Sequence, residues 1–451
     1  MKLLKLAALA VIICVMITGC DTSSDSPENL LNDNIVYNKS KNELYNFVNQ
    51  SLDGATLLLP GNSSEVGEIN ELDSNVIAFQ QKQDVNTNKN EVGLVLISKD
   101  NDKYVLKDSY LQVGEDIEYA NFYDLNNDEN DEVILLIKNG TVTTMNVYSI
   151  IDDEIKLVST VVPTWLDNYS KYTNTKIKIG FIDEDLKLDI LMINYDYNSG
   201  NMYATILNYD EDNQIKNSNS VKFDNVRNIN DLYATIGRVH NTKKGVVLSI
   251  PTTKDNGYIT QILCMEDGKL NKVFDEDKEI FNSYYVPTSD QNSDGVIALP
   301  ILNNNMIENY ASTNSKASAL ISWKKWNGKF KKESDTIFIS QVYYNYKNNF
   351  KFLVPNNLAN KLYIQKNILG DASYYIFYYY DKNDKEPTEL FQISISSKNL
   401  VEDTKNTANT DIILEETDSS YYQLVVKNKE IFEKYDLTLD NMKEYFSLIY
   451  Q

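Results

Sequence analysis

The chain has 451 residues, which allows two to three domains of ~150 residues each. Hydrophobic residues make up 42% and charged residues 24%, a balance typical of a folded chain with a sizeable core. Asp and Glu number 65 against 43 Lys and Arg, so the formal net charge is −22. An acidic chain repels polyphosphate, which excludes nucleic acid as a partner. A single histidine excludes a multi-histidine metal site.

Residues 1–19 have the pattern of an export signal. A short basic start precedes an apolar run over residues 6–17, which is too short for a comfortable membrane span. The run ends in Ile-Thr-Gly followed by Cys20, which resembles the signal of bacterial lipoproteins. The resemblance implies cleavage before Cys20 and attachment of lipid to it. It also implies a location on the extracytoplasmic face of the cell membrane. An ordinary signal peptide or membrane anchor is the alternative.

Residues 20–34 are small, polar and acidic, so we expect a flexible tether that holds the folded part away from the lipid surface. Once the signal is removed, Cys264 is the only cysteine besides Cys20, and no internal disulfide is expected. Cys264 lies in an apolar run, which favours a buried, unreactive thiol over a nucleophile.

Residues 35–340 are predicted to form one β-rich domain that begins with a capping helix. Ser40 and Glu43 have the spacing of a capping box. Leu44, Phe47 and Val48 follow as a single apolar stripe at helical spacing. The helix is therefore expected to cover the strands that come after it.

A turn between two strand-like apolar runs recurs every ~50–60 residues, a period typical of arrays. The Asp-Gly pair at 267–268 and the Asn-Gly pair at 327–328 stand between such runs. Both dipeptides favour tight hairpins, because the central residues of these turns adopt positive φ. Acidic turns at 100–102, 152–154 and 211–213 continue the series.

A second element, a strand and a polar loop leading into a short strand rich in Val, Ile and Leu, precedes each turn, and its loop is acidic in most copies but not at 235–248. The best copy spans 120–136, and further copies occupy 178–193, 289–299, 71–79 and 235–248. These loops resemble the FG-GAP/VCBS class of β-propeller repeat, whose mark is a D-x-[DN]-x-D-G loop followed by an acid and a Val/Ile strand. The resemblance implies a mainly β chain, a β-propeller of four-stranded blades. Five repeat units are visible, and a total of six or seven blades stays open. An irregular pair of β-sandwiches is the alternative.

Four residues of the best copy occupy positions 1, 3, 5 and 9 of a calcium-type loop: Asp124, Asn126, Asp128 and Glu132. Alternate residues of a tight loop bring their oxygens to one point, and a divalent cation relieves the repulsion between carboxylates. Position 6, where the sharp turn favours glycine, holds Glu129. We expect calcium here in a structural role, with a solvated acidic turn as the alternative.

A weaker calcium prediction concerns the loop with Asp290, Asn292 and Asp294 at positions 1, 3 and 5. Ala298 stands at position 9, so the closing carboxylate is missing. A third, shorter loop carries three acids at a related spacing: Asp183, Asp185 and Asp189.

Residues 341–451 are predicted to form a small α+β domain. Strand-like runs occupy 349–354, 373–380, 389–395 and 421–426, and a helix is expected over 442–449 with Thr438 as its N-cap. The tyrosine run at 374–380 favours core packing over a ligand platform, because only alternate residues share a face. The opening stretch 345–355 resembles PsbP-like domains of bacterial surface proteins.

The sequence contains no nucleophile elbow, no P-loop and no H-E-x-x-H motif. It therefore predicts a non-catalytic binding or scaffold module that acts through its propeller loops, with an envelope protein or wall polymer as partner. Two alternatives stay open. One is an enzyme acting on wall polysaccharide, since paired carboxylates need only meet in space. The other is an envelope assembly factor.

Overall fold

The computed structural model describes residues 39–52, 54–61, 66–69, 75–84, 86–101, 103–166, 174–209, 214–303, 306–307, 318–369, 372–380, 386–398 and 411–450. The predicted signal 1–19, the predicted lipid-attachment residue Cys20 and the predicted tether 20–34 lie outside these residues. None of the helices within these ranges combines the length and the apolar character needed to cross a bilayer.

The chain divides into two compact units, Met1–Val113 with Asp153–Ile155, and Gly114–Asp152 with Lys156–Gln451. The first unit contains helix α3 and sheet 1, whose strands pair in the order β1-β3-β4-β5, with β2 beside β3. Their bounds are α3 (Lys39–Ser51), β1 (Thr56–Leu57), β2 (Val66–Ile69), β3 (Asn75–Gln83), β4 (Asn90–Asp100) and β5 (Lys103–Val113).

Helix α3 begins one residue before the predicted N-cap Ser40 and covers one face of sheet 1. Its buried side chains Leu44 and Val48 pack with Val95 and Ile97 of β4. The single apolar stripe predicted for this helix is thus confirmed, and it buries the helix against the sheet.

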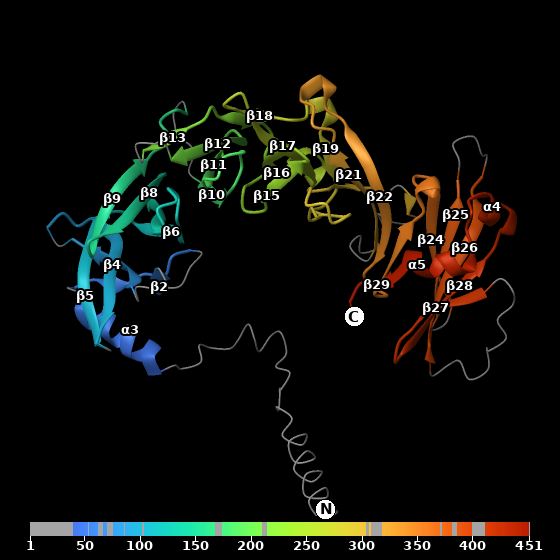
Figure 1. Cartoon of the computed structure of the whole chain (residues 1–451), viewed down its shortest axis with the longest axis horizontal. Coiled ribbons are helices and arrows are strands. Elements are labelled where there is room, and N and C mark those ends of the chain that lie inside the picture. Colours follow the sequence, from blue (N-terminus) through green and yellow to red (C-terminus); the bar gives the residue numbers. More distant parts are fainter. Residues whose placement is uncertain are drawn as a thin grey trace, which may run out of the picture. The chain divides into compact units, whose positions relative to one another are not determined.

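The second unit contains five further sheets, each built mostly from strands that follow one another in sequence (Figure 1). Sheet 2 comprises β6 (Asp116–Tyr123), β7 (Glu132–Asn139), β8 (Val142–Ile151) and β9 (Glu154–Val161). Sheet 3 comprises β10 (Asn174–Gly180), β11 (Asp189–Asp196), β12 (Asn201–Tyr209), β13 (Ile215–Asn217) and β14 (Val221–Phe223). Sheet 4 comprises β15 (Tyr233–His240), β16 (Lys243–Pro251), β17 (Tyr258–Glu266), β18 (Lys269–Lys272) and β19 (Ile280–Asn282).

Sheet 5 comprises β20 (Leu299–Leu302), β21 (Ser318–Trp326), β22 (Thr336–Asn345), β23 (Phe350–Val354) and β29 (Phe446–Leu448), paired in that order. Sheet 6 comprises β24 (Leu362–Leu369), β25 (Ala372–Tyr379), β26 (Thr388–Ser397), β27 (Asp411–Glu416) and β28 (Ser420–Val426). Two short helices, α4 (Lys429–Lys434) and α5 (Leu439–Tyr445), lead back from sheet 6 to β29.

Neighbouring sheets of the second unit share apolar cores. Sheets 2 and 3 share one core, sheets 3 and 4 the next, sheets 4 and 5 a third, and sheets 5 and 6 the last. The reason lies in the central strands, because β11 is buried along its whole length and so exposes neither face. The predicted fold class is confirmed as mainly β, with five consecutive sheets of four or five strands followed by an α+β part.

Two predicted hairpins have the expected turn geometry. Asp267 and Gly268 join β17 to β18 with φ of 50° and 71°, and Asp152 and Asp153 join β8 to β9 with φ of 54° and 63°. Positive φ at both central residues matches the twist of the flanking strands. These turns set the register of their strands from local sequence alone.

The tight hairpin predicted at Asn327-Gly328 is wrong. Strand β21 ends at Trp326 and its partner β22 begins only at Thr336. The intervening chain passes around the buried Trp326 ring, whose Nε1 donates to the Lys329 carbonyl at 2.6 Å. Gly328 is still required, because its φ is 80° and a Cβ there would lie 2.8 Å from His240 Nε2.

The C-terminal helix is shorter than predicted. Thr438 is its N-cap as expected, since the Thr438 hydroxyl accepts from the Asn441 N–H at 3.2 Å. The helix ends at Tyr445, however, and Phe446 begins β29, so the predicted helix over 442–449 is wrong beyond that point. The cause is tertiary packing, because the buried Phe446 ring stacks on Phe350 at 5.5 Å.

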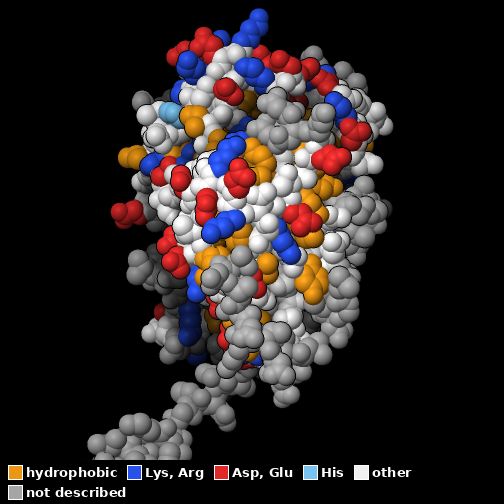
Figure 2. Space-filling model, turned by 90° about the vertical axis from the view of Figure 1, so that its right-hand side faces the viewer, with side chains coloured by type: hydrophobic (Ala, Val, Ile, Leu, Met, Phe, Trp, Pro, Cys, Tyr) orange, Lys and Arg blue, Asp and Glu red, His pale blue; other side chains and the backbone are white. Residues whose placement is uncertain are grey.

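Strand β22 crosses the predicted domain boundary between residues 340 and 341 and pairs with β21 on one side and β23 on the other. The division at that boundary stays a prediction. The tyrosine run lies in β25, where Tyr375, Phe377 and Tyr379 are buried in the core of sheets 5 and 6. On the face drawn in Figure 2, acidic and basic side chains are interspersed among scattered hydrophobic ones.

We expect Phe352→Ala to lower the free energy of unfolding by about 3–5 kcal/mol, because the ring is fully buried between sheets 5 and 6. The neighbouring Leu353 points to the opposite face and is 39% exposed, so Leu353→Ala should cost less than about 1 kcal/mol. Urea unfolding followed by tryptophan fluorescence measures both. Equal losses in the two variants would contradict the assignment of the two faces.

Candidate functional site

The predicted calcium loop connects β6 to β7 and has the backbone conformation that such a loop needs. Asn127 and Glu129 have φ of 62° and 70°, so the sixth position does take the left-handed conformation although it holds glutamate. The Asp124 carboxylate closes the loop by accepting from the N–H groups of Asp128 at 3.1 Å and Glu129 at 3.0 Å.

Glu132, at position 9, is the first residue of β7 and lies buried beneath the loop. Its Oε2 accepts from the Leu125 N–H at 3.0 Å, and its Oε1 accepts from the Ser149 hydroxyl at 3.2 Å and the Asn126 side-chain amide at 3.3 Å. Burial raises the pKa of Glu132 to about 7, and the nearby Asp128 charge adds to the effect. A positive charge at this point would favour the carboxylate.

A tyrosine from the neighbouring sheet adds an unsatisfied group near this loop. The Tyr209 ring at the end of β12 is 6% exposed, and its hydroxyl has no hydrogen-bond partner among the described residues. Burial, with the charges of Glu132 and Asp128, raises the pKa of the Tyr209 hydroxyl. A buried hydroxyl without a partner is costly, so a polar ligand beside it would be stabilised.

The four predicted residues, Asp124, Asn126, Asp128 and Glu132, thus lie in one loop and supply the hard oxygens that calcium prefers. They are not gathered into a formed metal centre. Across the described ranges, no three His, Cys, Asp or Glu side chains are arranged to hold a metal ion. Instead, the carboxylate oxygens of Asp124 accept hydrogen bonds from N–H groups of the same loop. The Asn126 side-chain amide donates to Asp128 Oδ2 at 3.0 Å.

The shorter loop between β10 and β11 satisfies its buried acid internally. Asp189, the first residue of β11, is fully buried, and its Oδ2 accepts from the N–H groups of Ile182 at 2.7 Å and Asp183 at 3.1 Å. Its Oδ1 accepts from the side-chain amide of Asn208. Burial raises the pKa of Asp189 to about 7. Asp189 therefore occupies the same structural position as Glu132, at the start of the second strand.

The loop at 290–295, the weaker calcium prediction, already contacts a lysine of the same chain. The Lys325 ammonium donates to Asn292 Oδ1 at 2.5 Å and forms an ion pair with Asp294. These are positions 3 and 5 of the predicted loop, and Asp290 accepts from the Gly295 N–H at 2.7 Å. Sequence reasoning missed Lys325, because it comes from β21 and its proximity depends on strand pairing.

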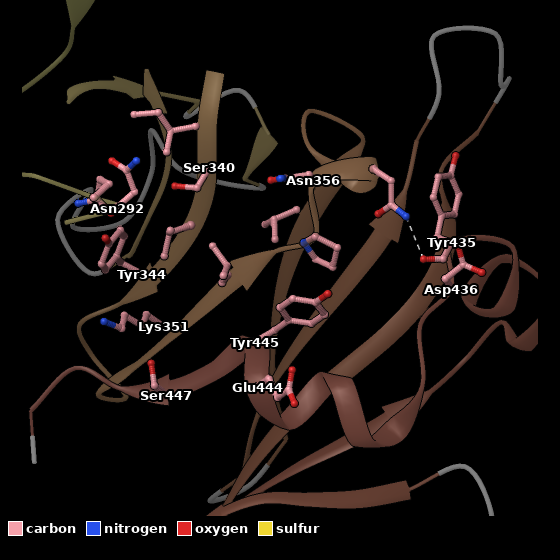
Figure 3. A pocket seen from close by; sticks show the side chains of 17 residues that line it. Asn292, Ser340, Tyr344, Lys351, Asn356, Tyr435, Asp436, Glu444, Tyr445 and Ser447 are labelled. Carbon is pink, nitrogen blue, oxygen red and sulfur yellow. Dashed lines mark hydrogen bonds between the residues drawn. The ribbon is translucent and has the colours of Figure 1, made fainter. Parts of the chain in front are cut away.

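A groove of about 760 Å³ runs along the face of β22 and β23 that is turned away from sheet 6 (Figure 3). Cross-strand neighbours Val342 and Leu353, and Tyr344 and Lys351, form its floor. Ser447 of β29, the cross-strand partner of Lys351, extends this floor, and Glu444 and Tyr445 of α5 also line the groove. The groove therefore offers apolar surface together with charges of both signs.

The end of β23 opens into this groove. Strand β29 pairs only with residues Phe350, Lys351 and Phe352, so no described strand covers Leu353 and Val354 on that side. The turn that follows is held in place, because the Asn357 side-chain amide donates to the Tyr435 carbonyl at 3.0 Å. Sequence reasoning missed this site, since its residues come from three separate parts of the chain.

Cys264 and His240 are the two side chains to consider for nucleophilic or general-base chemistry. Cys264 is buried, its thiol donates to the Lys244 carbonyl at 3.1 Å, and burial raises its pKa to about 11. A thiol with that pKa stays protonated at neutral pH. His240 ends β15, and its ring lies edge-on to Trp326 at 5.9 Å with Nδ1 3.1 Å from the Thr242 hydroxyl.

No protein-family model matches the chain, and a search of curated proteins found no match. Among solved structures, the chain is similar to polysaccharide lyase Uly1 with a TM-score of 0.30 and 9% identity, over 83% of this chain and 91% of that one. It is similar to the β-propeller domain of the trilobed protease from Pyrococcus furiosus with a TM-score of 0.27 and 11% identity, over 73% and 88%. Likenesses at these scores carry no inference about activity.

We expect the stability contributed by Asp189 to fall as pH rises. Below about pH 4 the carboxyl is protonated in both states, and between there and about pH 7 the unfolded state ionises first, which favours unfolding by up to about 4 kcal/mol. Asp189→Asn removes this loss, so its free energy of unfolding should change less than the wild type's between pH 5 and pH 8.

The matched control is Asp185→Asn, an exposed acid in the same loop. Urea unfolding at the two pH values measures all three chains. If Asp189→Asn and wild type show the same pH dependence, the burial of this charge does not govern the stability of the loop.

Proposed function

We propose that this chain is a binding module of the cell envelope, tethered through lipid on Cys20, that holds an extended segment of a partner protein in the groove beside β23. The observation that carries the proposal is the end of β23, where no described strand pairs with the outer edge at Leu353 and Val354 and the 39% exposed Leu353 side chain lines the groove beside the buried Val354. An exposed strand edge offers N–H and C=O groups in the spacing that another extended chain can pair with.

The side chains around the edge support a polypeptide as ligand. Leu353 is 39% exposed and lies beside Val342, which gives an apolar contact for alternate side chains of a bound strand. Lys351 on the floor and Glu444 of α5 provide opposite charges at different points of the groove, which would fix the direction of the segment. The volume of about 760 Å³ suits a short segment.

The proposed location rests on the sequence. The apolar run and the Ile-Thr-Gly-Cys20 end resemble a lipoprotein signal, and the acidic residues 20–34 would act as the tether. An envelope protein is then the partner within reach of the groove. A wall polymer and an enzyme acting on it remain the alternatives that the experiment below separates.

The groove is tested by Leu353→Asp, which places a charge at the uncovered end of β23. The full chain, immobilised in detergent, is exposed to membrane extract of the source organism, and a synthetic peptide from the captured protein is then titrated against it. We expect peptide affinity to fall at least about tenfold in Leu353→Asp, because the apolar contact is lost and a charge is desolvated.

The control is Ile337→Asp, which alters a 59% exposed residue of β22 that does not line the groove. It should bind the peptide as wild type does, and thermal melting confirms that both variants fold. Capture of wall polymer with no protein, or equal binding by both variants, would overturn the proposal.

We also propose that the loop between β6 and β7 binds calcium, which would pin the connection and neutralise its acids. The spacing of Asp124, Asn126, Asp128 and Glu132, the positive φ of Glu129 and the partnerless Tyr209 hydroxyl support this. The loop at 290–295 is the weaker candidate, because Lys325 already supplies a positive charge to it.

Calcium should raise the melting temperature of the wild-type chain more than magnesium does. Calcium accepts several oxygen ligands in a flexible geometry, whereas magnesium requires a nearly ideal octahedron. Asp128→Asn should abolish this rise, whereas Asp294→Asn in the loop beside Lys325 should leave it intact. Differential scanning calorimetry with each ion measures the shift. No calcium response in the wild type, or the same response in all three chains, would refute the site.

A further inference from the structure

A second hollow, of about 660 Å³, lies between sheets 3 and 4, where the first strands β10 and β15 face each other. Its walls carry Lys178, Arg238 and Lys244, together with the ring of Phe181. We propose that this hollow binds an acidic saccharide, a sugar chain that carries carboxylate or phosphate groups. The inference goes beyond the proposed function, because it concerns a different site and a different ligand.

The strand alternation explains why the cations meet. Ile177 and Ile179 of β10 pack into the core of sheets 2 and 3, so Lys178 between them points to the side of sheet 4. Ile236 of β15 packs towards sheet 3, and Arg238, two residues later, shares its face. The two side chains therefore approach the same space from opposite sheets.

The charges in this hollow are unusual for the molecule. The chain has a net charge of −22, and acidic and basic side chains are interspersed on the face drawn in Figure 2. The residues lining the hollow include three cations and no Asp or Glu. Neither Lys178 nor Arg238 forms an ion pair with another residue in the described part of the chain. An anion in the hollow would supply the missing counter-charge.

Strand pairing adds a like-charge contact that an anion would relieve. Arg238 and Lys244 are direct cross-strand partners in the β15–β16 ladder. Like charges in that position destabilise a sheet. Lys244 is partly compensated, because its ammonium donates to the Asp185 carbonyl at 3.3 Å and lies near the Asp183 carboxylate. Arg238 has no such partner, and its planar guanidinium suits a carboxylate or phosphate group.

The aromatic wall favours a sugar over a bare anion. Phe181 is 46% exposed although it is a large apolar ring, and the Lys244 ammonium lies 5.2 Å from its centroid. An exposed ring gives a flat apolar surface against which the C–H face of a sugar can pack. Gly180, next to it, lets β10 and β15 approach each other closely, since a Cβ there would lie 3.1 Å from the Ile236 side chain. Ring and cations together therefore fit a sugar with an acidic substituent.

The test is calorimetric titration of the full chain in detergent at about 50 mM salt, where ionic contacts are least screened. Three probes separate the sources of the charge: trigalacturonate for carboxylate, an oligomer of glycerol phosphate for phosphate, and neutral maltotriose. We expect at least one acidic probe to bind at least about tenfold more tightly than maltotriose. Arg238→Gln should weaken that binding at least about tenfold, and Arg238→Lys should retain part of it.

Lys269→Gln is the matched control, because it removes one exposed cation from β18 of the same sheet, away from the hollow. It should bind the acidic probe as wild type does, and so should the groove variant Leu353→Asp. The saccharide result can therefore be interpreted even if the groove proposal is wrong. Thermal melting checks that each variant folds. The proposal is overturned if neither acidic probe binds, if maltotriose binds equally well, or if folded Arg238→Gln binds as tightly as wild type.

Discussion

The central strands of these sheets are apolar on both faces, and the rest of the structure depends on that constraint. Strand β11 is buried along its whole length, and β16 is buried from Gly245 to its end. A sheet with two apolar faces is stable only when both are covered, so each sheet of the second unit packs against a neighbour. Polar side chains that are buried within central strands, such as Gln261 and Gln341, donate hydrogen bonds to other buried groups.

The acidic loops show how this framework handles charge at a strand end. The first residue of the second strand is an acid in two sheets, Glu132 and Asp189, and each accepts a backbone N–H from the chain that enters the loop. In the loop that leads to β20 of sheet 5, position 9 is Ala298, just before the strand, and Lys325 of β21 contacts the loop oxygens. Buried acids therefore accept backbone N–H groups at two of these loops, whereas in the loop at 290–295 a lysine of the chain contacts the side-chain oxygens.

Local signals predicted the features that local chemistry controls. The Asp267-Gly268 turn needs only positive φ at two adjacent residues, and the Thr438 cap needs only one hydroxyl near one N–H group. The predictions failed where tertiary packing determines the local structure. Phe446, for example, lies outside the helix because its ring stacks on Phe350. The groove and the cationic hollow were beyond sequence reasoning for the same reason. Their walls meet only after strands far apart in the sequence have paired.

The groove and the cationic hollow also share a physical origin. Both faces of the central strands pack against neighbouring sheets. By contrast, β10 and β15 are the first strands of their sheets, and β23 is next to the last strand of sheet 5. Only such outer strands keep side chains and backbone groups free for a ligand. The residues that bind are then largely distinct from those that hold the fold, as Leu353 and Phe352 illustrate on the two faces of β23. Contact surfaces of this chain can therefore change in evolution with little cost to the cores beneath them.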